Sequence, residues 1–259
     1  MTNYIKSEVY RNLKSKGNYI FLFGGMGFAI FLNIALGLYS NSQVNFPYGN
    51  TEFSFSSFYT SMSMIMILCL PLVATIYGHE FKYNTLKNSI SYGIPRNQIY
   101  FGKFLMELII SLINLICISG VYIISAYVML ENSGIVYLNE LLRSLIACFP
   151  LLIMSITVAH CFYFIFENET NVGVMWVGVM VVIPMIVNMA GRGISFLEKV
   201  AYWMPWNIIT NIEYDSIAQT LVMHWSSQEG LIECFIVGAI GTIIFYILGL
   251  ILFKKREIK

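Results

Sequence analysis

The chain has 259 residues, of which 58% are hydrophobic and only 11% are charged, and its formal net charge is +1. Its mean hydropathy is +0.71. Because soluble domains carry about 25% charged residues, these values exclude an ordinary water-soluble protein. We therefore expect a membrane protein with no nucleic-acid partner.

Six stretches of the chain are apolar enough, at about 20 residues each, to cross a bilayer. The predicted spans are residues 19–39, 58–77, 104–130, 145–166, 172–189 and 231–253. Their apolar residues are continuous rather than alternating, which favours helices over a barrel. The sequence thus predicts an all-α polytopic membrane protein with six transmembrane helices in one transmembrane domain, residues 1–259.

Lysine and arginine are distributed unevenly between the segments that flank these spans. Of the 15 basic residues, twelve fall on the side of the N-terminus, and Arg143, Arg192 and Lys199 fall on the other side. The side with more lysine and arginine is normally cytoplasmic. We therefore expect both termini to be cytoplasmic.

The first segment, residues 1–17, spaces Ile5, Val9 and Leu13 four residues apart, with basic residues between them. This pattern predicts an amphipathic helix that lies on the membrane surface and ends at Gly17. A frayed basic tail is the alternative, because short isolated helices are marginal in water.

Residues 190–230, before the last span, are too polar to cross the bilayer but contain Trp203, Trp206 and Trp225. Tryptophan is typical of the headgroup level. We expect one or two short helices that dip into the outer interface as a re-entrant-like segment. A loop folded over the mouth of the bundle is the alternative, although unstructured connections of this length are uncommon.

The sequence contains no hydrolase motif, no metal-ligand cluster and no phosphate-binding loop. It therefore predicts no catalytic residues, no metal site and no cofactor bound by this chain. Polar residues within spans are candidates for a substrate path. These candidates are Asn33, Glu107, Asn114, His160 and Asn188.

Two of these candidates are ionisable. Glu107 lies near the inner end of the third span, where it could reach the headgroups or pair with Lys103 four residues earlier. His160 is the only histidine deep in a predicted span. We interpret it as a neutral histidine that is hydrogen-bonded to a neighbouring helix, with a functional role as the alternative.

Residues 78–103 join the second and third spans on the basic side and contain Lys82, Lys87, Arg96 and Lys103. The spacing of apolar residues within this segment predicts a short helix with one narrow apolar face. A helix of this kind outside the bilayer needs either lipid or a groove on a soluble partner to cover that face.

The end of that short helix is marked by residues with special backbone preferences. Gly93 permits an unusual backbone conformation, and Pro95 disfavours helix at the residue before it. Asn97 is a candidate cap for the helix that follows.

This segment resembles the cytoplasmic coupling segment of permeases in the type 2 family of ABC transporters, which share the type V exporter fold. Its members have a glutamate, a Gly-Thr-Leu run, a Pro-hydrophobic-Ser-Arg run and a lysine that opens the third span. The residues that carry the resemblance are Glu80, Asn84, Thr85, Leu86, Ile94, Pro95, Arg96 and Lys103. The chain departs from the pattern at Asn84, where glycine is usual, and at Arg96, which follows Pro95 directly.

The resemblance implies a half-transporter that pairs with a second copy or a sister permease. Two separate ABC ATPase subunits would bind ATP and Mg and dock beneath it. The coupling helix would lie in a groove of the ATPase. The residues implied in this coupling are Glu80, Phe81, Tyr83, Thr85, Leu86, Lys87, Ile90 and Arg96.

Family members of about this size often export antimicrobial or amphipathic peptides or give immunity to bacteriocins. The resemblance therefore implies an exporter of such peptides in the cytoplasmic membrane of a bacterium. ABC export of a lipid, drug or ion is the first alternative. A membrane scaffold or immunity protein that does not transport, and an intramembrane enzyme that uses His160 or Glu107, are the others.

Overall fold

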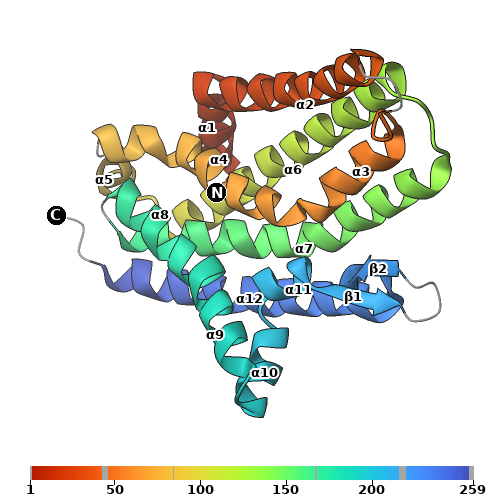
Figure 1. Ribbon diagram of the computed structural model, residues 1–259. Helices are drawn as coiled ribbons and strands as arrows, with labels where there is room; N and C mark the ends of the chain where they lie inside the picture. Colours follow the sequence, from red (N-terminus) through yellow and green to blue (C-terminus); the bar gives the residue numbers. More distant parts are fainter. Residues whose placement is uncertain (1, 43–45, 84, 167, 216–219, 257–259) are drawn as a thin grey trace.

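The computed structural model describes residues 2–42, 46–83, 85–166, 168–215 and 220–256. Within these ranges, the side chains of residues 2, 78–83, 85–86, 214–215 and 220–221 are not described. The helices are α1 (Thr2–Leu13), α2 (Lys16–Ser42), α3 (Thr51–Thr60), α4 (Met62–Tyr83), α5 (Thr85–Ser91), α6 (Arg96–Met129), α7 (Ile135–Ile165), α8 (Glu169–Val177), α9 (Ile183–Gly191), α10 (Ser195–Tyr202), α11 (Pro205–Thr210) and α12 (Gln228–Lys255). A π-helix (Gly178–Val182), a 3-10 helix (His224–Ser226) and the strands β1 (Ile212–Asp215) and β2 (Thr220–Met223) complete the fold (Figure 1).

Five helical segments among the described residues are long and apolar enough to cross a membrane: α2, α6, α7, α12 and the continuous run from α8 to α9. The chain is thus an almost entirely helical, multi-pass membrane protein. The predicted span at residues 58–77 is not one straight helix. It falls on α3 and α4, which meet at a bend of 61° and make a sixth span only if they are counted together.

The break between α3 and α4 lies at Ser61, whose backbone N–H bonds to the carbonyl of Phe58 at 3.1 Å. At its other end, α3 is capped by Asn50, whose side-chain oxygen accepts from the N–H of Phe53 at 2.9 Å. A capped start satisfies backbone groups that would otherwise lack partners. Helix α3 is therefore a regular helix with its own N-cap and not the frayed end of α4.

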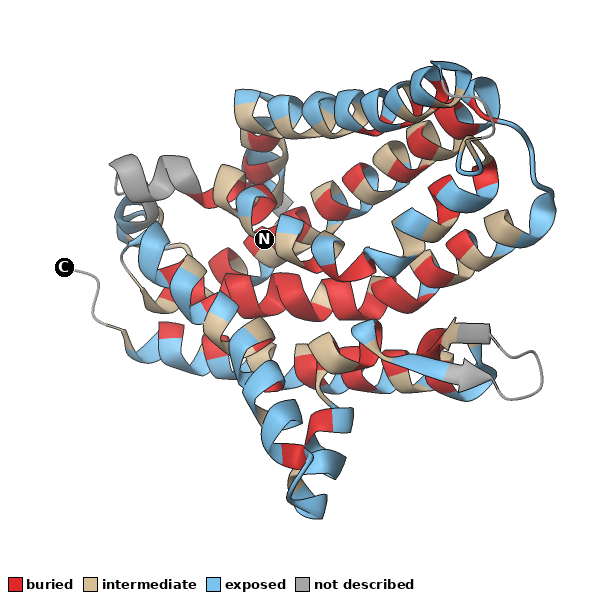
Figure 2. Cartoon of the chain, in the orientation of Figure 1, coloured by how far each residue is buried: buried red, intermediate tan, exposed pale blue. Residues whose placement is uncertain are grey.

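Helix α7 is the centre of the bundle. In its most apolar 18-residue window 78% of the residues are buried inside the protein, against 17–28% for the other four spans. Figure 2 shows this as a nearly continuous buried stretch along α7. Apolar side chains of α4, α6, α8 and α12 complete the main core around it.

Helix α12 approaches α7 closely through glycines. A Cβ atom added to Gly238 would lie 2.5 Å from the carbonyl carbon of Pro150, one added to Gly241 would overlap Met154, and one added to Gly249 would lie 3.0 Å from Cα of Cys161. Small residues let two helix backbones come together where the lipid supplies no hydrophobic drive for association. The α7–α12 pair therefore depends on the absence of side chains at these positions.

Helix α1 packs against α6 instead of standing free. Tyr4, Glu8 and Asn12 are its buried side chains, while Leu13 is 61% exposed. The predicted end at Gly17 is wrong, because α1 ends at Leu13 and Gly17 lies in the first turn of α2. Glycine is not needed there because a short turn already separates the two helices.

The segment between α9 and α12 differs from its prediction in two respects. It contains the short helices α10 and α11, but also an antiparallel hairpin in which Ile212 pairs with Met223, so strands must be added to the all-α description. Trp203 is 46% exposed, whereas Trp225 is fully buried in the main core and is covered by protein.

Candidate functional site

The segment between α4 and α6 folds much as its sequence predicts. Helix α5 ends at Ser91, and Gly93 has a φ of +78°, which confirms the expected unusual backbone. The predicted cap is wrong: α6 begins at Arg96, the N-cap position is Pro95, and Asn97 is already inside the helix. Proline is well suited there because its fixed φ allows extended backbone before the first helical residue.

The predicted coupling residues lie on and around α5. The side chains of Glu80, Phe81, Tyr83, Thr85 and Leu86 fall outside the described residues. Lys87 is exposed, and Ile90 is partly buried and packs against the main core. Helix α5 is therefore attached to the bundle through Ile90, while Lys87 remains accessible.

Arg96 connects this segment to the last helix. Its Nη1 atom donates to the carbonyl oxygens of Phe253 at 2.7 Å, Lys254 at 2.8 Å and Arg256 at 2.7 Å. The last carbonyls of a helix have no partner within the helix, and a cation at this end also favours the helix dipole. Arg96 therefore caps the C-terminus of α12.

Arg256 makes a matching contact with the central helix. Its Nη1 atom donates to the carbonyl of Phe164, near the end of α7, at 2.9 Å. Together with Arg96, it joins the start of α6 and the ends of α7 and α12. We call this group of helix ends, with α5 beside it, the basic end of the bundle (Figure 1).

A charged pair is buried between α1 and α6. The Lys103 side chain is inaccessible, and its Nζ atom lies 3.4 Å from Oε1 of Glu8 and 5.4 Å from the ring centre of Tyr77. Glu8 also pairs with Arg11. A buried ammonium group needs such partners, because it has lost its hydration. Sequence reasoning missed Glu8, which looks like one more polar residue of a surface helix.

Glu107 and His160 are brought together across α6 and α7. Nδ1 of His160 lies 2.7 Å from Oε1 of Glu107 and 2.8 Å from the hydroxyl of Tyr77 on α4. This confirms that His160 is hydrogen-bonded to neighbouring helices, and it gives Glu107 a histidine partner where Lys103 was expected. Both side chains are inaccessible.

The other polar atoms of this cluster face inward without a hydrogen-bond partner among the described residues. They are Oε2 of Glu107, Nε2 of His160 and the hydroxyl of Tyr100. The Tyr100 ring lies 4.2 Å from the His160 ring, centre to centre. The cluster thus has acid–base groups in contact.

Asn33 belongs to a separate, fully bonded cluster. Its Nδ2 donates to the carbonyl of Tyr122 at 3.0 Å and to Ser125 at 2.8 Å, and its Oδ1 accepts from Ser54 at 2.8 Å. These bonds fasten α2 to α3 and α6. Asn33 therefore has a structural role in holding α2, α3 and α6 together. Asn188, by contrast, is exposed on α9.

Asn114 continues a line of buried polar residues along α6 that begins at Lys103. The line comprises Lys103, Glu107, Ser111 and Asn114. Their spacing of four, four and three places them on one helix face. Sequence reasoning missed Ser111, although this spacing is a signal that could have found it.

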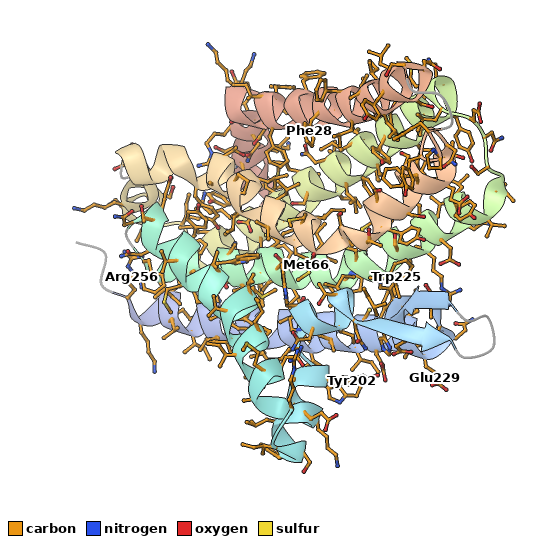
Figure 3. All side chains as sticks on the ribbon, viewed as in Figure 1. Phe28, Met66, Tyr202, Trp225, Glu229 and Arg256 are labelled. Carbon is orange, nitrogen blue, oxygen red and sulfur yellow. The ribbon has the colours of Figure 1, made fainter. Side chains whose placement is uncertain are left out.

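A cavity of about 730 Å³ lies beside this line, between α2, α4 and α6. Apart from Ser57, Ser61, Cys69, Ser111, Asn114, Ser119 and Tyr122, its walls are entirely apolar. Phe28, labelled in Figure 3, comes from the α2 wall. The cavity therefore places the predicted candidate Asn114 beside a largely apolar surface.

At the opposite end of the bundle, His224 lies between two carboxylates. Its Nε2 is 2.6 Å from Oε2 of Glu233, and its Nδ1 bonds to Glu213 of the hairpin. The hydroxyl of Tyr202 donates to Glu233 at 2.6 Å. Burial lowers the pKa of His224, but the hydrogen bonds to Glu213 and Glu233 raise it above its ordinary value of 6.5.

No protein-family model matches the chain, and no curated protein matches it either. Within the described ranges, no group of three or more His, Cys, Asp or Glu side chains could hold a metal ion. The structure thus offers three features for a function: the segment around α5 at the basic end, a buried acid–base cluster and a cavity.

Proposed function

We propose that this chain is the membrane-spanning permease subunit of an ABC exporter of the type 2 family. In this proposal two separate ATPase subunits bind and hydrolyse ATP, and a second permease copy or a sister permease completes the transporter. Both termini are cytoplasmic, in the cytoplasmic membrane of a bacterium. The cargo is an amphipathic or antimicrobial peptide.

The observation that carries the proposal is the attachment of the segment around α5. Ile90 packs against the main core, and Arg96 binds three carbonyl groups at the end of α12. A displacement of α5 would therefore be passed to α6 and α12 instead of being absorbed by a loose loop. Such a rigid connection is what a soluble ATPase needs if its two states are to bias two states of the helices.

The distribution of charge supports the same orientation. The exposed Lys87, Lys254 and Lys255 lie on α5 and at the end of α12. These helix ends belong to one end of the bundle (Figure 1). The positive-inside rule favours a cytoplasmic location for that end, which is where an ATPase would dock.

Export of a lipid, drug or ion by the same mechanism is the nearest alternative for the cargo. A membrane scaffold or immunity protein without transport is a further one. The buried contact between Glu107 and His160 favours a second candidate, an intramembrane enzyme, because the two groups could exchange a proton. In that case His160→Ala would abolish a chemical activity that needs no ATPase.

A site-specific cross-link tests the docking of the ATPase. Lys87→Cys places a thiol at an exposed position of α5, and Lys199→Cys places a matched thiol at an exposed position of α10, which follows the far end of the α8–α9 span. In native membranes, we expect the first variant to cross-link to a subunit with Walker A and signature motifs and the second to give no such product. Cross-linking from residue 199 alone would contradict the proposal.

A further inference from the structure

The cavity between α2, α4 and α6 has the dimensions of a binding site for a small molecule. Its volume of about 730 Å³ falls within the range of about 300–1,000 Å³ that is usual for such sites. Its α2 wall includes Gly24, where an added Cβ would meet no atom within 4 Å. The wall therefore leaves free space at this glycine.

Two polar side chains that line the cavity each carry a buried atom without a hydrogen-bond partner among the described residues. Asn114 and Ser111 each have an exposure of only 5%. Nδ2 of Asn114 donates to the carbonyl of Ile110 at 2.8 Å, but its Oδ1 atom and the Oγ atom of Ser111 have no partner within the described ranges. A buried polar atom without a partner is unfavourable, because it has lost its hydrogen bonds to water. A bound molecule with an N–H or O–H group would remove this cost.

The composition of the walls defines the rest of the molecule. No Asp, Glu, Lys or Arg lines the cavity in the described part of the chain, so a charged group would lose its hydration without gaining a counter-charge. The remaining surface is formed largely by side chains such as Ile20, Phe28 and Leu68. Such a surface matches a hydrocarbon chain, which has no polar group that needs a partner.

We propose that this cavity binds an uncharged, single-chain amphiphile. Its hydrocarbon chain lies along the apolar walls, and an amide or hydroxyl group donates to Oδ1 of Asn114 while bonding to Oγ of Ser111. This inference rests on the proposed permease function and, for the cargo, selects the lipid-like alternative over a peptide. The amphiphile could come from the surrounding membrane or from outside it, because molecules from both sources share this chemistry.

A fatty amide is the probe that tests the inference. A dodecanamide with a photoreactive diazirine in its chain is cross-linked to the full chain in nanodiscs, with no ATPase present, and the labelled residues are mapped. We expect labels on α2, α4 and α6. Unlabelled dodecanamide should compete about fivefold better than methyl dodecanoate, which has the same chain but no donor. Dodecanoate should compete least, because it is charged.

Two matched pairs of variants locate the binding. Asn114→Leu should remove the advantage of the amide over the ester, whereas Asn171→Leu, at an exposed asparagine on α8, should preserve it. Gly24→Leu should weaken both ligands by filling the cavity. Gly120→Leu is its control, because that glycine also has free space but does not line the cavity. If Asn114→Leu fails to fold, Ser111→Ala provides the same comparison.

Equal competition by the amide and the ester would overturn the inference, as would labels confined to other helices. Displacement of the probe only by an amphipathic peptide would overturn it in favour of a peptide site. Competition by a lipid extract from the native membrane, in addition to dodecanamide, would identify the bilayer as the source. Because these measurements omit the ATPase, their failure is distinct from a failure of cross-linking at residue 87.

Discussion

Nη1 of Arg96 lies 2.7 Å from the carbonyl oxygen of Phe253, which joins the first residue of α6 to the last turn of α12 across 157 positions of sequence. The guanidinium carbon also lies 5.5 Å from the centre of the Phe253 ring. The contact links the proposed docking segment to the end of a span. Arg96 therefore has a structural role within the chain, in addition to any contact that it makes with a partner.

Arg96→Gln is expected to destabilise the protein by about 2 kcal/mol, because hydrogen bonds from a charged donor to three carbonyl groups are lost. Thermal unfolding of the purified protein measures this loss. Arg192→Gln, at an exposed arginine after α9, is the control and should have little effect. Equal melting temperatures for the two variants would show that the cap of α12 is not important for stability.

Gly238→Ala should push α7 and α12 apart, because the new Cβ would lie 2.5 Å from the carbonyl carbon of Pro150. This carbon belongs to the backbone, which cannot relieve the overlap by a change of rotamer as a side chain could. We expect a loss of about 1–3 kcal/mol, the usual cost of overpacking. Gly120→Ala meets no atom within 4 Å and should be neutral or slightly stabilising, since alanine favours helix. Thermal unfolding of both variants checks the difference, and a stable Gly238→Ala protein would contradict the close contact.

The Glu107–His160 pair is expected to behave as one unit. His160→Leu leaves the buried Glu107 carboxyl group without its hydrogen-bond partner, at a cost of about 1–3 kcal/mol. The double variant Glu107→Leu, His160→Leu should be less destabilised than the sum of the single variants. A double-mutant cycle by thermal unfolding measures the coupling. Additive effects would show that the two side chains are independent.

His224 should make the attachment of the hairpin dependent on pH. Since its pKa is raised in the folded protein, its stabilising effect is complete below the ordinary value of 6.5 and is lost as the pH rises through the raised pKa. The difference in melting temperature between the wild type and His224→Gln should therefore shrink with rising pH. Glu229→Gln, at an exposed position of α12, should retain the wild-type pH dependence. A difference that is constant with pH would contradict this role.

The predicted spans could be found because about 20 consecutive apolar residues are sufficient evidence for a membrane-crossing helix. The fraction of each span that is buried inside the protein could not be predicted. Helices α2 and α7 have nearly the same mean hydropathy, 2.0 and 2.2, yet 17% and 78% of their windows are buried. Lipid and protein interior are equally apolar, so composition does not separate a lipid-facing helix from a central one.

The candidate site was predictable to a smaller extent. The turn at Gly93 could be predicted from the backbone preference of glycine itself. Contacts between distant residues carried no such local signal: nothing near Arg96 indicates the end of α12, and nothing near Glu107 indicates His160. The hairpin was missed because the strand-forming residues around Ile212 are few and lie within a segment whose tryptophans suggested a membrane interface.

The enclosed position of α7 has a consequence for how the protein meets its surroundings. Ser144, Ser155, Thr157 and His160 can all reside on α7 because neighbouring helices, not fatty acids, surround them. A change in membrane fluidity or thickness acts first on the outer helices and reaches α7 only through them. The hydrogen bonds of His160 are therefore shielded from direct contact with the lipids of the cell.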